Sequence, residues 1–135
     1  MMSWEKMVEL VVTRAKSRCE YCHMLQALQG GTFHVDHIIP TSRGGPTASS
    51  NLALACPGCN LRKSVRSKIK DPETGKTVPL FHPRKHRWHE HFRMQDYKVF
   101  GQTAIGRATV AFLELNHERR IDIRKAEDLF GLYKP

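Results

Sequence analysis

The chain has 135 residues, enough for one compact domain with a modest core or for a small domain with an appendage. Its 22 Lys and Arg against 13 Asp and Glu give a formal net charge of +9, which favours an anionic partner, nucleic acid before a membrane surface. No apolar run approaches the roughly 20 residues of a membrane span, and residues 1–10 lack a secretory pattern. We therefore expect an intracellular, cytoplasmic protein with no membrane partner.

The first half of the chain predicts a helix, two strands and a second helix. A helix is expected over residues 3–17, because Ser3 can cap it and apolar residues recur at helical spacing. Strands are expected over 33–39 and 51–55, joined by a loop too long for a tight hairpin. The next helix is expected over 60–70, before the turn signal DPETG.

The second half of the chain predicts mainly helices. Residues 72–83 read as loop or irregular strand, and a short helix is expected after Pro83. Two more helices are expected over 103–117 and about 122–130, the last one ending at Gly131. These elements predict an α+β protein with a module at residues 1–72 and a basic, helical extension at 73–135 that packs on it.

Four cysteines form two C-x-x-C pairs, Cys19 with Cys22 and Cys56 with Cys59. Thiols stay reduced inside cells, and two such pairs supply the four soft ligands of a tetrahedral zinc ion. A redox dithiol is the alternative, but a thioredoxin-like motif would sit beside a βαβ pattern, which is missing here. The pairs therefore predict a structural Zn²⁺ site whose two halves enclose an insert.

The insert contains HVDHIIP, which places His34, Asp36 and His37 on a predicted strand. Adjacent residues on a strand point to opposite faces, so Asp36 and His37 diverge unless the strand bends or bulges. Asn51 opens the second predicted strand, and Asn60 directly follows Cys59, so the zinc ion would fix where Asn60 points. Taken singly, each of these residues is common at a protein surface or in a turn. Together they predict a functional site.

The series CEYC, HVDHIIPTSRGG, NLALACPGCN and Lys63 resembles the HNH nuclease family in its zinc-stapled form, over about residues 14–66. The resemblance implies a ββα-metal fold and hydrolysis of phosphodiester bonds in nucleic acid, usually DNA. It makes Asp36 and Asn60 ligands of a catalytic divalent cation, His37 the general base and Asn51 the residue that holds the histidine-bearing loop. The last family position is Asn60 rather than His, as in phage enzymes that resolve branched DNA, and a prokaryotic or phage origin is expected.

The chemistry of these residue types agrees with the implied roles. A cation bound by Asp36 and Asn60 can touch the scissile phosphate and the leaving 3′ oxygen, and a neutral histidine can take a proton from the attacking water. Because Asp and Asn offer hard oxygen ligands, we expect Mg²⁺ or Mn²⁺ to support activity and zinc at this position to inhibit it.

Basic residues concentrate between Leu61 and Lys98, a stretch that contains eleven Lys and Arg but only four Asp and Glu. Such a cluster would neutralise backbone phosphates without reading sequence, although a solvated helix face is the alternative for any single residue. His34 is equally well read as a phosphate contact or as a solvated strand residue. The candidate nucleic-acid contacts are His34, Arg43, Arg62, Lys63, Arg66, Arg84 and Arg87.

The segment HPRKHRWHEHFR holds four histidines, with Trp88 and Phe92 at helical spacing. A second metal site is weakly supported, since no carboxylate or cysteine spacing accompanies the histidines. Burial of Trp88 and Phe92 against the core is the preferred interpretation. The segment also resembles the tail attached to HNH modules in some bacterial, notably cyanobacterial, proteins, a tail that implies no activity of its own.

The leading hypothesis is a metal-dependent endonuclease acting on DNA, and RNA stays open as a substrate. The alternative is a zinc-stabilised module that keeps the HNH-like fold and binds nucleic acid without cutting it. Sequence preference and oligomeric state are also left open by the sequence.

Overall fold

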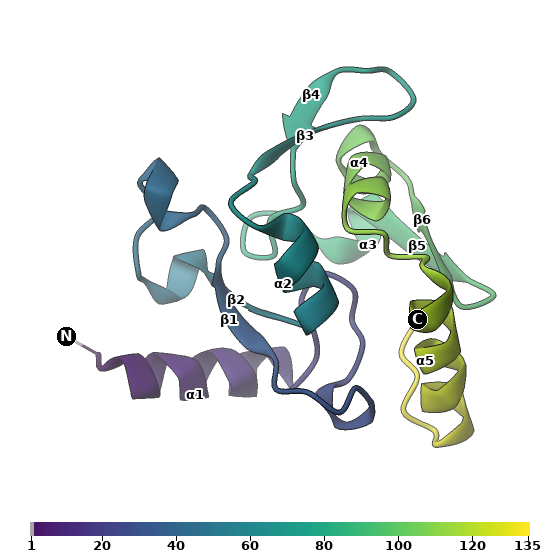
Figure 1. The fold of residues 1–135 in the computed structure, drawn as a ribbon, viewed down its shortest axis with the longest axis horizontal. Helices are drawn as coiled ribbons and strands as arrows, with labels where there is room; N and C mark the ends of the chain where they lie inside the picture. The colour runs from purple at the N-terminus through teal and green to yellow at the C-terminus, as the bar shows by residue number, and fades with distance from the viewer. Residues whose placement is uncertain (1) are drawn as a thin grey trace.

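A computed structural model describes residues 2–135 of the chain (Figure 1). The elements confirm an α+β fold built from short strand pairs and helices. In chain order they are α1 (Trp4–Ala15), β1 (His34–His37), β2 (Leu52–Ala55), α2 (Pro57–Lys63), β3 (Lys68–Lys70), β4 (Thr77–Pro79), α3 (Trp88–His91), β5 (Phe92–Gln95), β6 (Lys98–Gly101), α4 (Ala104–Phe112) and α5 (Glu118–Leu129), with 3₁₀ turns at Gln26–Leu28, Thr41–Arg43 and Ser49–Asn51. None of the helices between residues 2 and 135 is both long and apolar enough to cross a bilayer.

The strands β1 and β2 form an antiparallel pair, in which Asp36 lies opposite Ala53 and His37 opposite Leu52. All four residues of β2 are buried, whereas β1 is half-buried. Helix α1 packs along β2, and α2 contacts both strands. Figure 1 shows α1 along the lower edge of the molecule and α2 near its centre, so the strand pair lies between helices.

Helix α1 begins where the sequence predicted, because the Ser3 hydroxyl accepts a hydrogen bond from the Lys6 N–H. It ends at Lys16, which adopts a left-handed conformation. Arg14, near the end of α1, donates to the carbonyls of Ser49 and Leu52, 3.1 and 2.8 Å away. These two bonds fix α1 against the start of β2.

The predicted helix over 60–70 is shorter than expected and starts earlier. It covers Pro57–Lys63 and stops at Ser64, whose φ of +50° leaves the helical region. Residues 68–70 instead form β3, paired with β4. Arg66, which the predicted helix over 60–70 would have included together with Arg62, therefore lies beyond α2.

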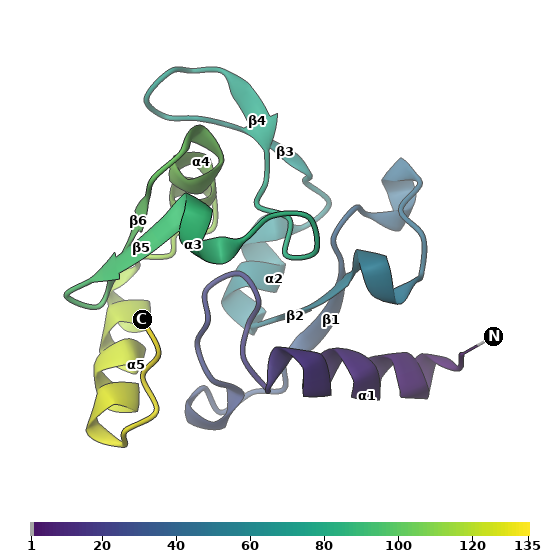
Figure 2. The same ribbon diagram turned by 180° about the vertical axis from the view of Figure 1, so that it is seen from behind.

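The C-terminal half also differs in detail from the prediction. The short helix begins at Trp88 rather than directly after Pro83, and the strand pair β5–β6 was not predicted. The next helix ends at Phe112, five residues early, while the last begins at Glu118, four residues early. Figure 2 shows α3, β5 and β6 grouped with α4, and α5 running below them.

One hydrophobic cluster contains buried residues from both halves of the chain. Trp88 is 7 % exposed and Phe92 is fully buried, which confirms that this pair packs against the core. The Trp88 indole N–H donates to the Tyr21 carbonyl over 3.0 Å. The C-terminal half is thus joined to the first cysteine knuckle by apolar contact and by this hydrogen bond.

Candidate active site

The four cysteines lie together, with their Sγ atoms all within 4.8 Å of one another. The Sγ atoms of Cys22 and Cys56 are 3.7 Å apart. Zinc–sulfur bonds of about 2.3 Å in a tetrahedron place the sulfurs about 3.8 Å apart, so the spacing fits zinc. All four side chains are buried, and this is the one metal-competent cluster of Cys, His, Asp and Glu found in residues 2–135.

The second knuckle also starts helix α2. Cys56 is the N-cap, and its Sγ accepts a hydrogen bond from the Cys59 N–H over 3.4 Å. Burial raises the pKa of the Cys19 and Cys22 thiols well above their ordinary range, while hydrogen bonds from the other three cysteines lower the pKa of Cys56. A dry cage of this kind holds several thiolates only with a bound cation.

Asp36 lies in a closely packed polar group. Its Oδ2 accepts a hydrogen bond from the Tyr21 hydroxyl at 2.9 Å and faces Lys63 Nζ at 3.1 Å. The Lys63 side chain is 1 % exposed and also donates to the His37 carbonyl over 3.1 Å. Burial raises the pKa of Asp36, although Lys63, Tyr21 and His37 oppose that shift. Lys63 thus ties helix α2 to β1 at the two residues of the predicted site.

His37 has different neighbours from Asp36, as alternation along a strand predicts. Its Nε2 lies 2.9 Å from the Thr47 hydroxyl, in the loop that follows the strand. Its ring is parallel to that of Trp4 at the start of α1, with an interplanar angle of 5° and centroids 6.2 Å apart. The loop and α1 therefore both flank the imidazole.

Asn51 fastens the loop between β1 and β2. Its Oδ1 accepts from the Ile39 N–H at 2.9 Å, and its Nδ2 donates to the carbonyls of Ile39 and Pro46 at 3.0 and 2.9 Å. The residue is only 4 % exposed. A Cβ at Gly45 would lie 1.8 Å from the Ile39 carbonyl oxygen, so the loop needs glycine at that position to close.

Asn60 lies three residues before Lys63 in helix α2, so the two side chains share a face of the helix. Because Lys63 reaches Asp36, that face is turned toward β1. Asn60 is half-buried, and within residues 2–135 its side-chain amide makes no hydrogen bond. No hydrogen bond to residues 2–135 therefore occupies its amide oxygen.

The seven candidate nucleic-acid contacts fall into two groups. His34, Arg43, Arg66 and Arg87 are exposed. Arg62 pairs with Glu114 at 2.8 Å and Arg84 pairs with Glu20, while Lys63 is buried beside Asp36. Arg43 Nε donates to the Val65 carbonyl over 3.4 Å, which brings Arg43 close to Arg66 beyond the end of α2.

The four histidines of residues 82–91 make local contacts instead of a shared ligand cluster. His82 Nδ1 accepts from the Arg84 and Lys85 amides, and His86 Nδ1 accepts from the His82 amide. His91 Nδ1 lies 2.6 Å from the Thr103 hydroxyl. The Nδ1 atoms of His82, His86 and His91 thus make hydrogen bonds within the fold, and residues 2–135 hold no cluster of three metal ligands there.

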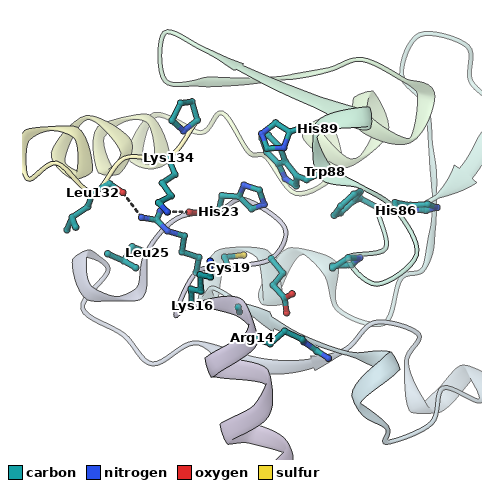
Figure 3. A pocket seen from close by; sticks show the side chains of 16 residues that line it. Arg14, Lys16, Cys19, His23, Leu25, His86, Trp88, His89, Leu132 and Lys134 are labelled. Atoms are coloured by element: carbon teal, nitrogen blue, oxygen red, sulfur yellow. Dashed lines mark hydrogen bonds between the residues drawn. The ribbon is translucent and has the colours of Figure 1, made fainter.

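A cavity of about 590 Å³ is lined neither by Asp36 nor by His37 (Figure 3). It lies between the end of α1, the first cysteine knuckle, α3 and the C-terminus. Its Arg18 donates to the carbonyls of His23 and Leu132, and His23 stacks on Trp88 with centroids 4.2 Å apart. The predicted site residues on β1 and α2 lie outside this cavity, so the cavity does not identify the predicted active site.

Several residues at the site were not singled out by the sequence. Tyr21, between the first two cysteines, bonds Asp36, and Thr47 bonds His37. Arg120 donates to Cys59 Sγ from helix α5 over 3.2 Å. Tyr21 could have been suspected from its place within the knuckle, whereas Thr47 and Arg120 carry no local signal.

Residues 19–66 match the protein family described as HNH endonuclease. The matched segment runs from the first zinc-knuckle cysteine past the end of α2, and so contains Asp36, His37, Asn51 and Asn60. No curated protein and no solved structure matches the chain.

Proposed function

We propose that this chain, whose residues 19–66 form an HNH endonuclease domain, is a metal-dependent nuclease that hydrolyses phosphodiester bonds of DNA. The observation that carries the proposal is the placement of Asp36 and His37 on β1, opposite the helix that begins in the zinc cage and bears Asn60. Members of this family act on nucleic acids, and the net charge of +9 favours a polyanionic substrate.

Asp36 and Asn60 would hold the catalytic cation, and their oxygen donors suit Mg²⁺ or Mn²⁺. Bound there, the cation would neutralise charge developing on the phosphate and on the leaving oxygen. The half-buried Asn60 amide makes no side-chain hydrogen bond to the described residues 2–135, which fits a ligand role. Asp36 is already paired with Lys63 and Tyr21, so these two groups orient its carboxylate and limit which oxygen can turn to a cation.

His37 acts as the general base. With its Nε2–H donated to Thr47, the opposite ring nitrogen, Nδ1, accepts the proton of the attacking water. The water oxygen forms a bond to phosphorus, the bond from phosphorus to the 3′ oxygen breaks, and the 3′ oxygen leaves with the bonding pair and takes a proton from solvent water to become a 3′-hydroxyl. Asn51 positions the loop that carries Thr47. The expected products are a 5′-phosphate and a 3′-hydroxyl.

Lys63 has a positioning role in this proposal rather than contact with a phosphate. Its side chain is 1 % exposed, and its Nζ already has the Asp36 carboxylate and the His37 carbonyl as partners. Phosphate contacts are therefore assigned to the exposed Arg43, Arg66 and Arg87, with His34 beside Asp36. Arg62 and Arg84 would first have to leave their carboxylate partners.

A supercoiled-plasmid nicking assay tests the proposal. The wild type should nick with Mg²⁺ or Mn²⁺, and added Zn²⁺ should inhibit. His37→Ala should lower the rate about 10²- to 10⁴-fold while plasmid binding stays at the wild-type level. His89→Ala, an exposed histidine on α3, is the matched control and should nick normally. Unchanged nicking by His37→Ala would reject the assigned base.

One observation favours the alternative of a module that binds nucleic acid without cutting it. The buried Lys63 ammonium already neutralises Asp36, so the carboxylate does not require a cation. That alternative predicts plasmid binding by the wild type with no nicking in any divalent metal. It also predicts that Mn²⁺ binds no more tightly to the wild type than to Asp36→Asn.

A further inference from the structure

Trp4 is a large aromatic side chain left 47 % exposed at the first position of helix α1. Tryptophan is enriched at binding interfaces because its ring combines a large apolar face with a polar N–H. The Ser3 cap fixes the start of the helix, so Trp4 is held by regular backbone. Its ring lies parallel to the His37 imidazole. An exposed aromatic ring is thus placed next to the proposed base.

We propose that the exposed face of Trp4 is a stacking platform for a nucleobase near the scissile phosphate. The inference rests on the proposed function, because it takes His37 as the place where the phosphodiester lies. Every nucleobase has a flat π-face, and aromatic side chains stack on bases without reading their sequence. Bases in a paired duplex have both faces covered, so the platform selects a nucleotide that is single-stranded, bulged or next to a branch.

The strand and loop of the proposed site offer contacts to a nucleic-acid strand rather than to an apolar partner. His34 and Arg43 are exposed on the strand and loop that form the site, and they add polar and cationic contacts for a phosphate backbone. Another exposed aromatic side chain, Phe130 (69 %), lies at the end of α5 on the far side of the molecule from the start of α1 (Figure 1). Phe130 therefore provides a matched control.

The test measures binding of fluorescently labelled DNA without added Mg²⁺ or Mn²⁺. Trp4→Ala should weaken binding to a short single-stranded or bulged oligonucleotide about 5- to 150-fold, the range for loss of one stacked base. The loss for a fully paired duplex should be much smaller. Trp4→Phe should retain most of the affinity, and Phe130→Ala should match the wild type.

Tryptophan fluorescence gives a second readout, because the only other tryptophan, Trp88, is buried. The single-stranded oligonucleotide should quench the wild type but not Trp4→Phe. Equal affinity of Trp4→Ala and the wild type, or an equal loss on paired and unpaired DNA, would overturn the platform. Those outcomes leave the His37→Ala nicking result untouched, so the two proposals fail separately.

A second, independent inference comes from the buried face of helix α5, which is charged instead of apolar. Arg120, Arg124 and Glu127 follow one another along this face and are 5 %, 1 % and 1 % exposed. Arg124 donates to the carbonyls of Leu115 and Tyr97, and Glu127 accepts from the Leu25 N–H over 2.9 Å. Arg120 Nη1 donates to Cys59 Sγ, and its Nη2 has no partner within residues 2–135.

We infer that Arg120 is the positioning residue and counter-cation of the zinc site. Four thiolates around one Zn²⁺ leave a net charge of −2, which is costly to bury without a compensating cation. Arg120 is the only side chain within residues 2–135 that donates an N–H to a cysteine sulfur. The C-terminal extension thereby stabilises the metal cage from outside, through a partner of the kind that tunes metal affinity elsewhere.

Zinc affinity measured by competition with a chromophoric chelator tests this inference. Arg120→Met should weaken zinc binding about 10- to 100-fold, and Arg120→Lys by less, because it keeps the charge but loses the planar fork. Arg119→Met, the exposed neighbour, should match the wild type. Wild-type affinity in both Arg120 variants would overturn the inference.

Hydrogen exchange of the wild type gives the reciprocal measurement. Removing zinc should increase exchange in α5 more than in α4, because α5 loses a charged partner. Equal protection of α5 with and without zinc would count against the coupling.

Discussion

The HNH module (residues 19–66) and the C-terminal region (residues 67–135) share one hydrophobic core but use their buried polar groups differently. In the module, polar groups gather around the proposed site: the four cysteines, the hydrogen-bonded Asn51 and the buried Lys63–Asp36 pair. In the C-terminal region, Phe81, Phe92 and Val99 are almost fully buried, and buried polar side chains such as Arg124 join one segment of the chain to another. The comparison teaches that the module fixes a few atoms for chemistry, while the C-terminal region completes the core that supports them.

The largest effect is expected from the four-cysteine cage, which we expect to hold zinc. Cys59→Ser removes one of four thiolates and also the sulfur that Arg120 contacts. Structural zinc contributes on the order of 10 kcal/mol to folding, so the variant should bind less than one zinc per chain and lose its cooperative unfolding transition. Metal analysis and circular dichroism measure both effects. A Cys59→Ser protein that unfolds like the wild type would show that the cage is not what holds the module.

The core of the C-terminal region should give the next largest effect. Phe92→Ala removes a fully buried ring that contacts Trp88 and Phe81, and should destabilise the protein by about 3–5 kcal/mol. Chemical denaturation measures the change, with Phe100→Ala as the control, since Phe100 is 38 % exposed. Zinc affinity should change far less than stability. Equal losses of both would mean that the two regions do not differ as described.

A smaller effect is expected from Asn51, whose side chain closes the loop between β1 and β2 through hydrogen bonds to Ile39 and Pro46. Asn51→Ala leaves the Ile39 N–H and two carbonyls without their side-chain partner, at a cost of about 2–3 kcal/mol in the free energy of unfolding. Nicking should fall more than stability alone predicts, because the Thr47–His37 contact depends on that loop. Denaturation and nicking assays on the same sample, with the exposed Ser50→Ala as control, separate the two losses.

The smallest effect concerns acid sensitivity of the C-terminal region. Burial, followed by Lys85 and His86, lowers the pKa of His82 to about 4. Between about pH 6.5 and 4, the unfolded chain therefore binds a proton at His82 that the folded chain does not bind. The contribution of the neutral His82 to the free energy of unfolding is complete above about pH 6.5 and is lost as the pH falls toward 4. Urea midpoints should decline less steeply with acid in His82→Gln than in the wild type. Acid also releases zinc from both proteins. If their urea midpoints decline in parallel as the pH falls, His82 does not cause the acid sensitivity.

Sequence alone predicted the features that depend on residue type at fixed spacing. The C-x-x-C pairs predicted the cage, and their burial and mutual distances confirm a metal-competent cluster. The start of α1 followed from Ser3, and the packing of Trp88 and Phe92 followed from helical spacing. The HNH resemblance was confirmed over residues 19–66, while the roles of Asp36, His37, Asn51 and Asn60 stay predictions.

Features that depend on distant partners were decided only by the tertiary structure. Lys63 looked like a phosphate contact from its place in a basic run, but it is buried because Asp36, 27 positions earlier, neutralises it. The end of α2 at Ser64 and the β5–β6 pair were missed because single residues in left-handed backbone, Ser64 with Asp96 and Tyr97, redirect the chain without a glycine signal. Arg120 reaches Cys59 across 61 positions, a contact that no local pattern encodes. The type and spacing of residues in the sequence predict local chemistry, whereas burial and charge pairing depend on which distant residues the fold brings into contact.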